Sequence, residues 1–212
     1  MPAKNPDLHG NAPDQCGAAL LLIDVINHFD YPGGRTLAGH ALPMARRLAA
    51  LKARARRAGI PAVYVNDNFG RWRSDFRSLV EHCGTPGSPS APIVDLLAPA
   101  DDDYFVLKPK HSGFYATALG TLLDYLGAET VILTGLTTEQ CVFFTASDAF
   151  LRDLRIVVPR DCVASIDPGE KAGALRRMGK LLDVDVRASS RLDLARLARP
   201  TRAGKARRGY AV

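Results

Sequence analysis

Residues 130–142 read Thr130-Val-Ile-Leu-Thr-Gly-Leu-Thr-Thr-Glu-Gln-Cys141-Val142, where an apolar strand changes into a helix within a few residues. This pattern predicts a thiol at the C-terminal edge of a parallel sheet, near the first turn of a helix. Ligands of open α/β sheets bind at that edge. Backbone N–H groups and the positive end of the helix dipole would favour a thiolate there. Cysteine also packs as a small apolar residue, so position alone does not separate a catalytic thiol from a core residue.

Similar apolar runs alternate with amphipathic segments of helical length along the chain. Continuous apolar strands, each followed by a helix, are typical of a parallel sheet covered on both faces. The sequence therefore predicts one doubly wound, three-layer α/β/α domain with a six-stranded parallel sheet. The expected strands are 18–25, 62–66, 104–108, 130–135, 155–159 and 183–187. The expected helices cover about residues 37–58, 73–82, 115–127, 139–152, 168–181 and 190–198.

The 212 residues are enough for one domain with a substantial core. We expect this domain to span residues 1–199, with residues 1–16 as an extended N-terminal arm. Residues 84–100 are rich in Pro, Gly and Ser and predict one long loop, either a surface excursion or a lid. Residues 200–212 predict a basic, flexible C-terminal tail.

Composition excludes several classes of protein. Apolar residues make up 47% of the chain, and no apolar run approaches the roughly 20 residues that cross a bilayer. The first residues lack the apolar core of a signal peptide, so we expect a cytoplasmic protein. The four cysteines include no C-x-x-C pair, which fits a reducing compartment better than a disulfide framework.

The net charge of +6 is unevenly distributed. Eight Lys or Arg residues and one acid lie in residues 187–212, which leaves a body with a net charge near −1. The tail could contact RNA, an acidic partner or only solvent. A nearly neutral body without a basic, aromatic platform does not predict a nucleic-acid-binding protein.

Three polar side chains follow strands that should end at one edge of the sheet. Asp24 follows the first strand, Lys108 ends the third, and Cys141 follows the fourth. A carboxylate, an ammonium and a thiol in one crevice supply a general base, a charge-holding group and a nucleophile. Each also has an ordinary explanation as a helix cap, a strand-end charge or a core thiol. Their arrival together at one edge favours the catalytic interpretation.

The same residues lie in blocks that resemble the isochorismatase-like cysteine hydrolases, which include nicotinamidases, N-carbamoylsarcosine amidohydrolases and ureidoacrylate amidohydrolases. The blocks cover most of the chain, about residues 18–165. They are Leu20-Leu-Leu-Ile-Asp24-Val-Ile-Asn27-His-Phe29, Val106-Leu-Lys108-Pro-Lys-His-Ser112-Gly-Phe114-Tyr-Ala-Thr117-Ala-Leu119 and Gly135-Leu-Thr-Thr-Glu-Gln-Cys141-Val-Phe-Phe-Thr145-Ala-Ser-Asp148-Ala149.

The resemblance implies roles for these residues. Cys141 would attack a carbonyl carbon, Asp24 would take its proton and pass it to the leaving amine, and Lys108 would hold both. Lys108 rather than Lys110 matches the family pattern, because it stands six residues before Phe114. The family also implies a cis peptide between Leu136 and Thr137, aiming the N–H groups of Thr137 and Cys141 at the oxyanion. The Lys108 ammonium should help to keep the Cys141 thiol ionised.

The pattern also departs from one branch of the family. Nicotinamidases carry an Asp-x-His motif and a further histidine that bind a metal, whereas residues 65–72 contain no histidine. We therefore expect no metal and no cofactor, and nicotinamide is a disfavoured substrate. The remaining histidines near the site, His28 and His111, are expected to line the pocket or lie at the surface. Relatives in the family imply a homo-oligomer, a dimer or a tetramer.

The substrate pocket is expected to include Asn27, Phe29, Trp72 and Phe114, although aromatic residues at such positions are also ordinary core. Arg71 and Arg73 could receive a carboxylate or remain in solvent. We expect Cys16, Cys83 and Cys162 to be structural or incidental, because they have no partner residues at the binding edge of the sheet.

Isochorismatases proper hydrolyse a vinyl ether without a cysteine nucleophile, so Cys141 favours cleavage of a C–N bond. The sequence thus predicts a cysteine amidohydrolase acting on a small amide, carbamoyl or lactam-like compound. The alternatives are a non-catalytic member that binds a small molecule or partner through the same pocket and, less favoured, a nicotinamidase.

Overall fold

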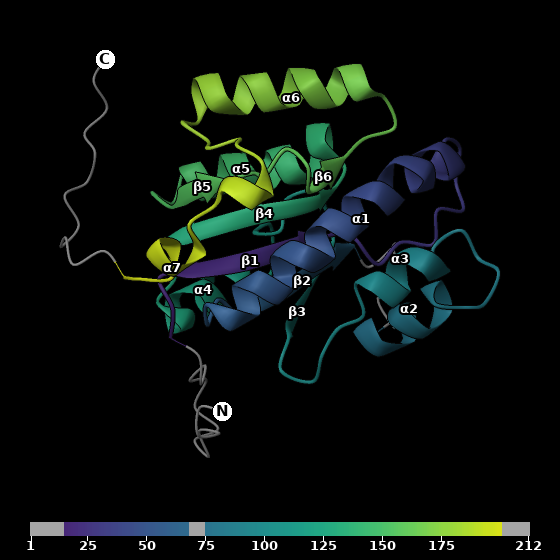
Figure 1. Ribbon diagram of the computed structural model, residues 1–212, viewed down its shortest axis with the longest axis horizontal. Coiled ribbons are helices and arrows are strands. Elements are labelled where there is room, and N and C mark those ends of the chain that lie inside the picture. The colour runs from purple at the N-terminus through teal and green to yellow at the C-terminus, as the bar shows by residue number, and fades with distance from the viewer. Residues whose placement is uncertain (1–14, 68–74, 201–212) are drawn as a thin grey trace.

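The computed structural model describes residues 15–67 and 75–200, which form a parallel sheet between two layers of helices (Figure 1). The strands are β1 (Ala18–Ile23), β2 (Ala62–Asp67), β3 (Tyr104–Lys108), β4 (Thr130–Leu136), β5 (Arg155–Val157) and β6 (Val163–Ala164). The helices are α1 (Gly34–Arg57), α2 (Phe76–Cys83), α3 (Ala91–Leu96), α4 (Leu119–Leu126), η1 (Thr138–Val142), α5 (Phe143–Phe150), α6 (Pro168–Leu181), η2 (Ser189–Arg191) and α7 (Leu194–Leu197). None of the described helices combines the length and apolar character that crossing a membrane requires.

The order of the strands fixes where a ligand can bind. The main path of the sheet runs β3-β2-β1-β4-β5, and β6 pairs with the far end of β4, beyond β5. All of these pairs are parallel. The chain winds outward from β1 through β2 to β3 and then returns to the other side of β1 with β4. The winding therefore reverses between β1 and β4, which is the switch point where open α/β sheets form a crevice.

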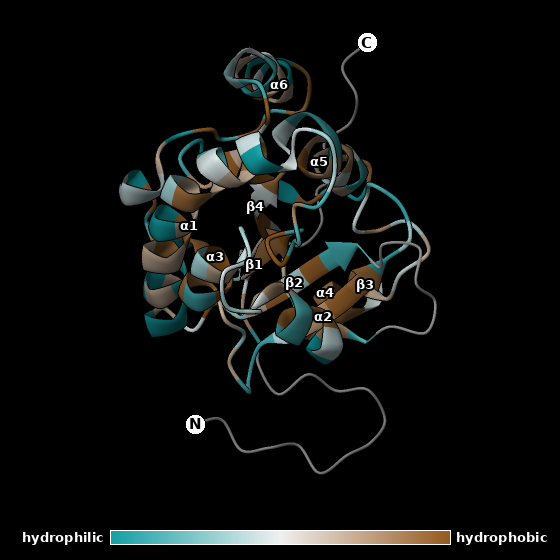
Figure 2. Cartoon of the chain, turned by 90° about the vertical axis from the view of Figure 1, so that its right-hand side faces the viewer, coloured by the Kyte–Doolittle hydropathy of each residue, from teal (hydrophilic) through white to brown (hydrophobic). Residues whose placement is uncertain are grey.

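The two sides of the sheet carry separate hydrophobic clusters. Along β1, Leu20 and Leu22 face the cluster beneath α1, α2 and α3, whereas Leu21 and Ile23 face the cluster beneath α4, α5 and α6. Successive side chains of a strand point to opposite faces, so a strand buried on both sides must be apolar throughout. Figure 2 shows this pattern, with brown strands inside and helices such as α1 carrying teal segments.

The predicted fold class is confirmed, and the first five strands lie close to their expected positions. The sixth expected strand, 183–187, is wrong. Only an isolated bridge joins Val157 and Asp185. Asp183 has a φ of 52°, and the Arg187 N–H donates to the Asp185 side chain at 3.1 Å instead of extending the ladder. The sixth strand is instead β6, whose two residues pair with Gly135 and Leu136 of β4.

The segment 84–100 is not one continuous loop, because it contains α3. Ile93 and Val94 of this helix are buried in the cluster beneath α1. Their backbone N–H groups donate to the Ser90 carbonyl, and the Ser90 hydroxyl donates to the Cys83 carbonyl at 2.7 Å. These contacts anchor the segment against α2 and the core. The segment 84–100 is therefore packed against the rest of the domain along α3.

The helices otherwise follow the expected ranges with shifted ends. The segment expected as a helix from 115 becomes helical only at Leu119, after a left-handed Ala116 with a φ of 53°. The segment expected from 190 to 198 divides into the short helices η2 and α7. The expected arm and tail lie, apart from residues 15, 16 and 200, outside the described residues.

Candidate active site

Three strand ends deliver the predicted triad to the switch point. Asp24 directly follows β1, Lys108 is the last residue of β3, and Cys141 lies in η1, the π-helical turn that follows β4. The Lys108 Nζ lies 2.9 Å from the Asp24 Oδ2 and 3.5 Å from the Cys141 Sγ. Asp24 and Cys141 are also joined by a side-chain hydrogen bond. The structure thus brings together the three residues that the sequence proposed, and their catalytic role stays a prediction.

The backbone at the C-terminal ends of β1 and β4 is unusual. Asp24 adopts the left-handed region with a φ of 50°, which aspartate tolerates better than most residues. Gly135, the register partner of Ile23, has a φ of 105°, and a Cβ at this position would lie 2.0 Å from the Ile23 carbonyl oxygen. Only glycine lets the two strands approach so closely where the crevice begins.

A second carboxylate belongs to the site, and the sequence analysis did not assign it. Asp67 ends β2 and is the register partner of Lys108. Its Oδ2 lies 3.6 Å from the Lys108 Nζ, and its N–H donates to the Asp24 Oδ1 at 2.6 Å. The rule that gathers strand ends at one edge would have included Asp67, because β2 lies between β1 and β3. Lys108, whose side chain is fully buried, is therefore flanked by two acids.

Burial and charge set the protonation of the triad. Burial raises the pKa of Asp24 above its ordinary value of 3.8, although Lys108 opposes this. Burial alone would lower the pKa of Lys108, but the charges of Asp24 and Cys141 outweigh it and the pKa rises above 10.5. Burial and the Asp24 carboxylate raise the pKa of the Cys141 thiol well above 9.0, and the Lys108 charge offsets only part of this increase. This direction opposes the expected resting thiolate, and the protonation state of Cys141 at neutral pH stays a prediction.

Two side chains from loops complete the surroundings of the thiol. The His111 Nδ1 lies 3.7 Å from the Cys141 Sγ, and its ring stacks on Phe144 with centroids 5.6 Å apart. Tyr31 accepts a hydrogen bond from the Asn27 side chain. Burial raises the pKa of the Tyr31 hydroxyl, and the negative charges of Asp24 and Cys141 add to the increase. This electrostatic coupling places Tyr31 near the triad, a position that no sequence motif indicated.

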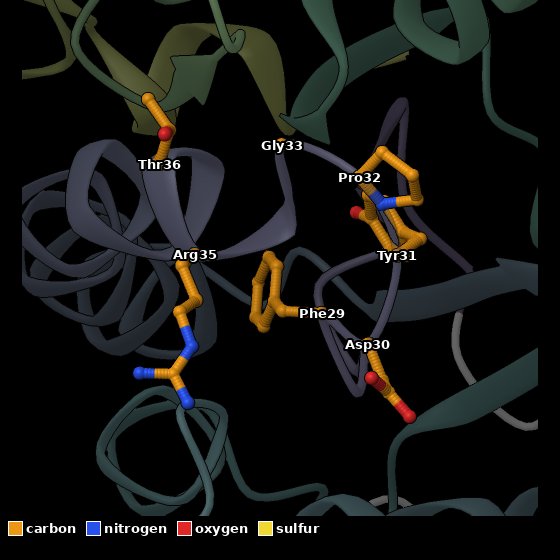
Figure 3. Close-up of a pocket in the computed structure, with 7 residues that line it drawn as sticks. All are labelled: Phe29, Asp30, Tyr31, Pro32, Gly33, Arg35 and Thr36. Atoms are coloured by element: carbon orange, nitrogen blue, oxygen red, sulfur yellow. The ribbon is translucent and has the colours of Figure 1, made fainter.

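The loop from β1 to α1, which carries Tyr31, forms a pocket of about 510 Å³ (Figure 3). In Figure 3 the side chains of Arg35 and Asp30 flank the ring of Phe29. The pocket thus offers an aromatic wall with one cation and one anion. Its lining residues are Phe29, Asp30, Tyr31, Pro32, Gly33, Arg35 and Thr36.

The four residues expected to line the pocket fall in different places. Phe29 lines the pocket just described. Asn27 is buried, its Oδ1 accepts a hydrogen bond from the Phe29 N–H at 2.8 Å, and its side chain is also hydrogen-bonded to Tyr31. Phe114 packs in the cluster beneath α4, α5 and α6, with the Arg152 guanidinium 4.5 Å from its ring centroid. Trp72 lies outside the described residues, as do Arg71 and Arg73. The pocket roles of Asn27, Phe114 and Trp72 stay predictions.

The expected cis peptide between Leu136 and Thr137 is wrong, because the described residues contain no cis peptide bond. Thr137 has extended dihedral angles, φ −88° and ψ 152°, that lead directly into η1. The Thr137 carbonyl accepts from the N–H groups of Gln140 and Val142, each at 3.2 Å. The oxyanion hole formed by the Thr137 and Cys141 N–H groups stays a prediction.

Metal ligands and the other cysteines can be placed within the described residues. No group of three or more His, Cys, Asp or Glu side chains in residues 15–67 and 75–200 is arranged to hold a metal. Because residues 68–74 follow Asp67 directly, the expectation of a metal-free site stays a prediction. Cys16, Cys83 and Cys162 are buried in the cluster beneath α1, which confirms their expected packing role.

Comparisons with known proteins agree with this fold. The isochorismatase domain model matches residues 18–186. The isochorismatase family protein YaaI of Bacillus subtilis is 39% identical over 168 residues, which cover 79% of this chain and 92% of that protein. Maleamate amidohydrolase of Pseudomonas putida is 31% identical over 165 residues, which cover 72% of this chain and 75% of that protein.

The crystal structure of N-carbamoylsarcosine amidase from Thermoplasma acidophilum superposes with a TM-score of 0.63 at 29% identity. The match covers 83% of this chain and 98% of that chain. The resemblance inferred from the three sequence blocks is confirmed by these matches. Because the family model spans most of the sequence and the similar proteins are covered over most of their length, the chain belongs to the isochorismatase family.

Proposed function

We propose that the protein is a cysteine-dependent amidohydrolase that cleaves a C–N bond in a small amide, carbamoyl or lactam-like substrate. The observation that carries this proposal is the contact of one buried ammonium with both a carboxylate and a thiol. The Lys108 Nζ lies 2.9 Å from Asp24 and 3.5 Å from Cys141, at the crevice between β1 and β4. A thiol that only filled space in the core would not need a buried, charged neighbour on each side.

The chemistry follows from the protonation of these groups. As the Cys141 Sγ attacks the carbonyl carbon, its proton passes to the Asp24 carboxylate, and a tetrahedral intermediate forms. Asp24 then gives this proton to the nitrogen, the C–N bond breaks, and the amine leaves a thioester on Cys141. Water attacks the thioester and gives a proton to Asp24, which returns it to the departing sulfur. The acid product and the free thiol result, so Asp24 acts alternately as base and acid.

A raised thiol pKa is consistent with this cycle. The thiol does not need to be ionised at rest when a base is already hydrogen-bonded to it, because the proton leaves as the S–C bond forms. Lys108 stays protonated throughout, since its pKa lies above the ordinary value. Its ammonium can therefore compensate negative charge on the sulfur and on Asp24 in turn. The Asp67 Oδ2, 3.6 Å from the Lys108 Nζ, also balances part of the ammonium charge.

The relatives support the class of bond and are consistent with a small substrate. One similar protein is a maleamate amidohydrolase, and a similar structure is an N-carbamoylsarcosine amidase, so both act on a C–N bond next to a carbonyl. The pocket at residues 29–36 is of a size that holds a compact molecule. No observation on the described residues favours nicotinamide over these compounds.

A screen of primary amides and N-carbamoyl compounds tests the proposal, with ammonia release as the readout. The wild-type protein should release ammonia from at least one compound, and Cys141→Ala should release none above background. Rapid quenching followed by mass spectrometry should then find the acyl group on Cys141. Hydrolysis by Cys141→Ala at the wild-type rate would refute a covalent mechanism. Specific binding of a screened compound without turnover would instead support the non-catalytic alternative.

A further inference from the structure

His111 contacts the reacting sulfur, although no part of the proposed mechanism uses it. It lies in the connection between β3 and α4, three residues after Lys108. Its Nδ1 lies 3.7 Å from the Cys141 Sγ, within hydrogen-bonding reach of a sulfur atom. The face of its ring stacks on Phe144 of α5, at an interplanar angle of 22°. The ring therefore has an aromatic neighbour on one face while its Nδ1 lies near the thiol.

The hydrogen-bond partners of the triad decide which atom donates in this contact. Both oxygens of the Asp24 carboxylate accept hydrogen bonds, from Lys108 and from the Asp67 N–H. An ionised carboxylate only accepts, so the single proton of the thiol must point to Asp24 in their mutual hydrogen bond. The ammonium of Lys108 can only donate. The remaining contact of the sulfur, with His111, therefore requires the hydrogen to lie on Nδ1.

We propose that His111 is a further catalytic residue, whose Nδ1–H donates a hydrogen bond to the Cys141 sulfur and stabilises the thiolate as it forms. The inference rests on the proposed function for its catalytic meaning, but the hydrogen bond itself is testable without a substrate. His111 transfers no proton in this role, because the thiol proton passes to Asp24. The sulfur, once negative, is held by two donors, Lys108 from β3 and His111 from the β3–α4 connection.

The other charged or titratable groups around the sulfur come from different elements. Asp24 follows β1, Lys108 ends β3, and Tyr31 lies in the connection from β1 to α1. Of these, only Lys108 favours the ionised sulfur, whereas the Asp24 charge opposes it. Removing the His111 donor should therefore raise the apparent pKa of the thiol, since nothing else in this group replaces it.

The experiment measures alkylation of Cys141 by iodoacetamide as a function of pH, with peptide mapping to separate it from the other cysteines. His111→Phe keeps an aromatic ring against Phe144 but removes the donor. We expect it to raise the apparent thiol pKa by about one unit, so that alkylation at neutral pH is about tenfold slower. His111→Asn places an amide near the position of Nδ1 and should stay within about threefold of the wild-type rate. His82→Phe, in α2, is the matched histidine-to-phenylalanine control and should leave the profile unchanged.

The outcomes separate this inference from the proposed function. A wild-type thiol pKa in folded His111→Phe would overturn the inference, even if the protein hydrolyses amides. An Asn variant as slow as the Phe variant would also overturn it, because a donor would then not be what matters. A raised pKa with rescue by Asn supports it, even in a protein that hydrolyses none of the tested amides. His111→Leu, which lacks the donor as well, serves the same test if the Phe variant does not fold.

Discussion

Asp24 and Asp67 both approach the Lys108 ammonium, but they differ in distance and exposure. The Asp24 carboxylate lies 2.9 Å from Nζ with 8% of its side chain exposed, whereas Asp67 lies at 3.6 Å with 32% exposed. Of the two acids, Asp24 is the one that shares a hydrogen bond with the thiol. These differences favour Asp24 over Asp67 for the proposed proton transfer.

Isosteric substitutions should separate the two acids. Asp24→Asn removes the general base and should lower kcat/KM by about 10²- to 10⁴-fold. Asp67→Asn keeps the N–H that supports Asp24 and should lower kcat/KM by less than about tenfold. Steady-state kinetics on any substrate found in the amide screen provides the measurement. An equal loss in both variants would show that the two carboxylates act as one unit.

Cys83 predicts an alkaline limit to stability. Burial raises the pKa of this thiol from 9.0 to about 11. A pKa that is higher in the folded state stabilises the protein fully below pH 9, and the stabilisation decreases as pH rises toward 11. By pH 10 the free energy of unfolding should have fallen by about 1 kcal/mol from this residue. Urea titrations at several pH values should show a shallower alkaline decline for Cys83→Ala, whatever its stability at neutral pH. Parallel declines in both proteins would contradict the assignment.

Sequence reasoning located the triad because parallel strands end at a common edge, so each side chain could be placed without knowing a loop. The same reasoning covers Asp67, which follows directly from the position of β2. It placed His111 near the site without a defined contact, and it did not identify Tyr31, because the positions of both depend on the conformation of two loops. The thiolate expectation is opposed by two effects that the sequence does not show. It counted the ammonium and the helix but not the burial and the Asp24 charge, which only the packed structure reveals.

At the scale of elements, the junction of β4 with η1 depends on Gly135. The strand pairs with β1 up to Ile23 and Gly135, and η1 begins three residues later, at Thr138. Gly135→Ala would place a methyl group 2.0 Å from the Ile23 carbonyl in a left-handed backbone. We expect the free energy of unfolding to fall by about 3 kcal/mol or more.

Gly39→Ala provides the matched control for that substitution. Gly39 lies within α1, and a Cβ there meets nothing within 4 Å. The change should stabilise the protein by about 0.5–1 kcal/mol, because alanine favours a helix over glycine. Chemical denaturation of both variants gives the comparison. A Gly135→Ala protein as stable as the wild type would mean that the two strands can separate without loss.

The elements that the sequence missed are those with too little pattern to detect. The two residues of β6 pair with the part of β4 that extends past β5. Their strand conformation therefore depends on tertiary contacts rather than on a local sequence pattern. Residues 183–187 alternate like a strand, but the turn at Asp183 leaves only Asp185 in register. The helix α3 was hidden by the surrounding Pro, Gly and Ser. In each case the long, continuous strands were predictable and the short edge elements were not.

At the scale of the whole molecule, the C-terminal part of the described chain closes over the start of the sheet. The Arg54 guanidinium donates to the Ser189 and Leu192 carbonyls, each at 2.9 Å. The Gly17 N–H donates to the Ala198 carbonyl at 2.9 Å, which ties the beginning of β1 to the end of α7. Residues up to 200 therefore belong structurally to the domain. The expected homo-oligomer stays a prediction, which sedimentation equilibrium measures directly.

Two truncations should behave differently because of these contacts. A chain that ends at residue 200 keeps every contact just described and should retain the wild-type Tm and rate of hydrolysis. A chain that ends at residue 188 loses the buried side chains of Leu192 and Leu194, 6% and 5% exposed. Its free energy of unfolding should fall by about 3–6 kcal/mol.

The chain that ends at residue 200 also lacks the basic residues 202, 205, 207 and 208. Loss of RNA binding with unchanged hydrolysis would locate any nucleic-acid contact in the tail, and loss of hydrolysis on ending at residue 200 would show that the tail serves the active site.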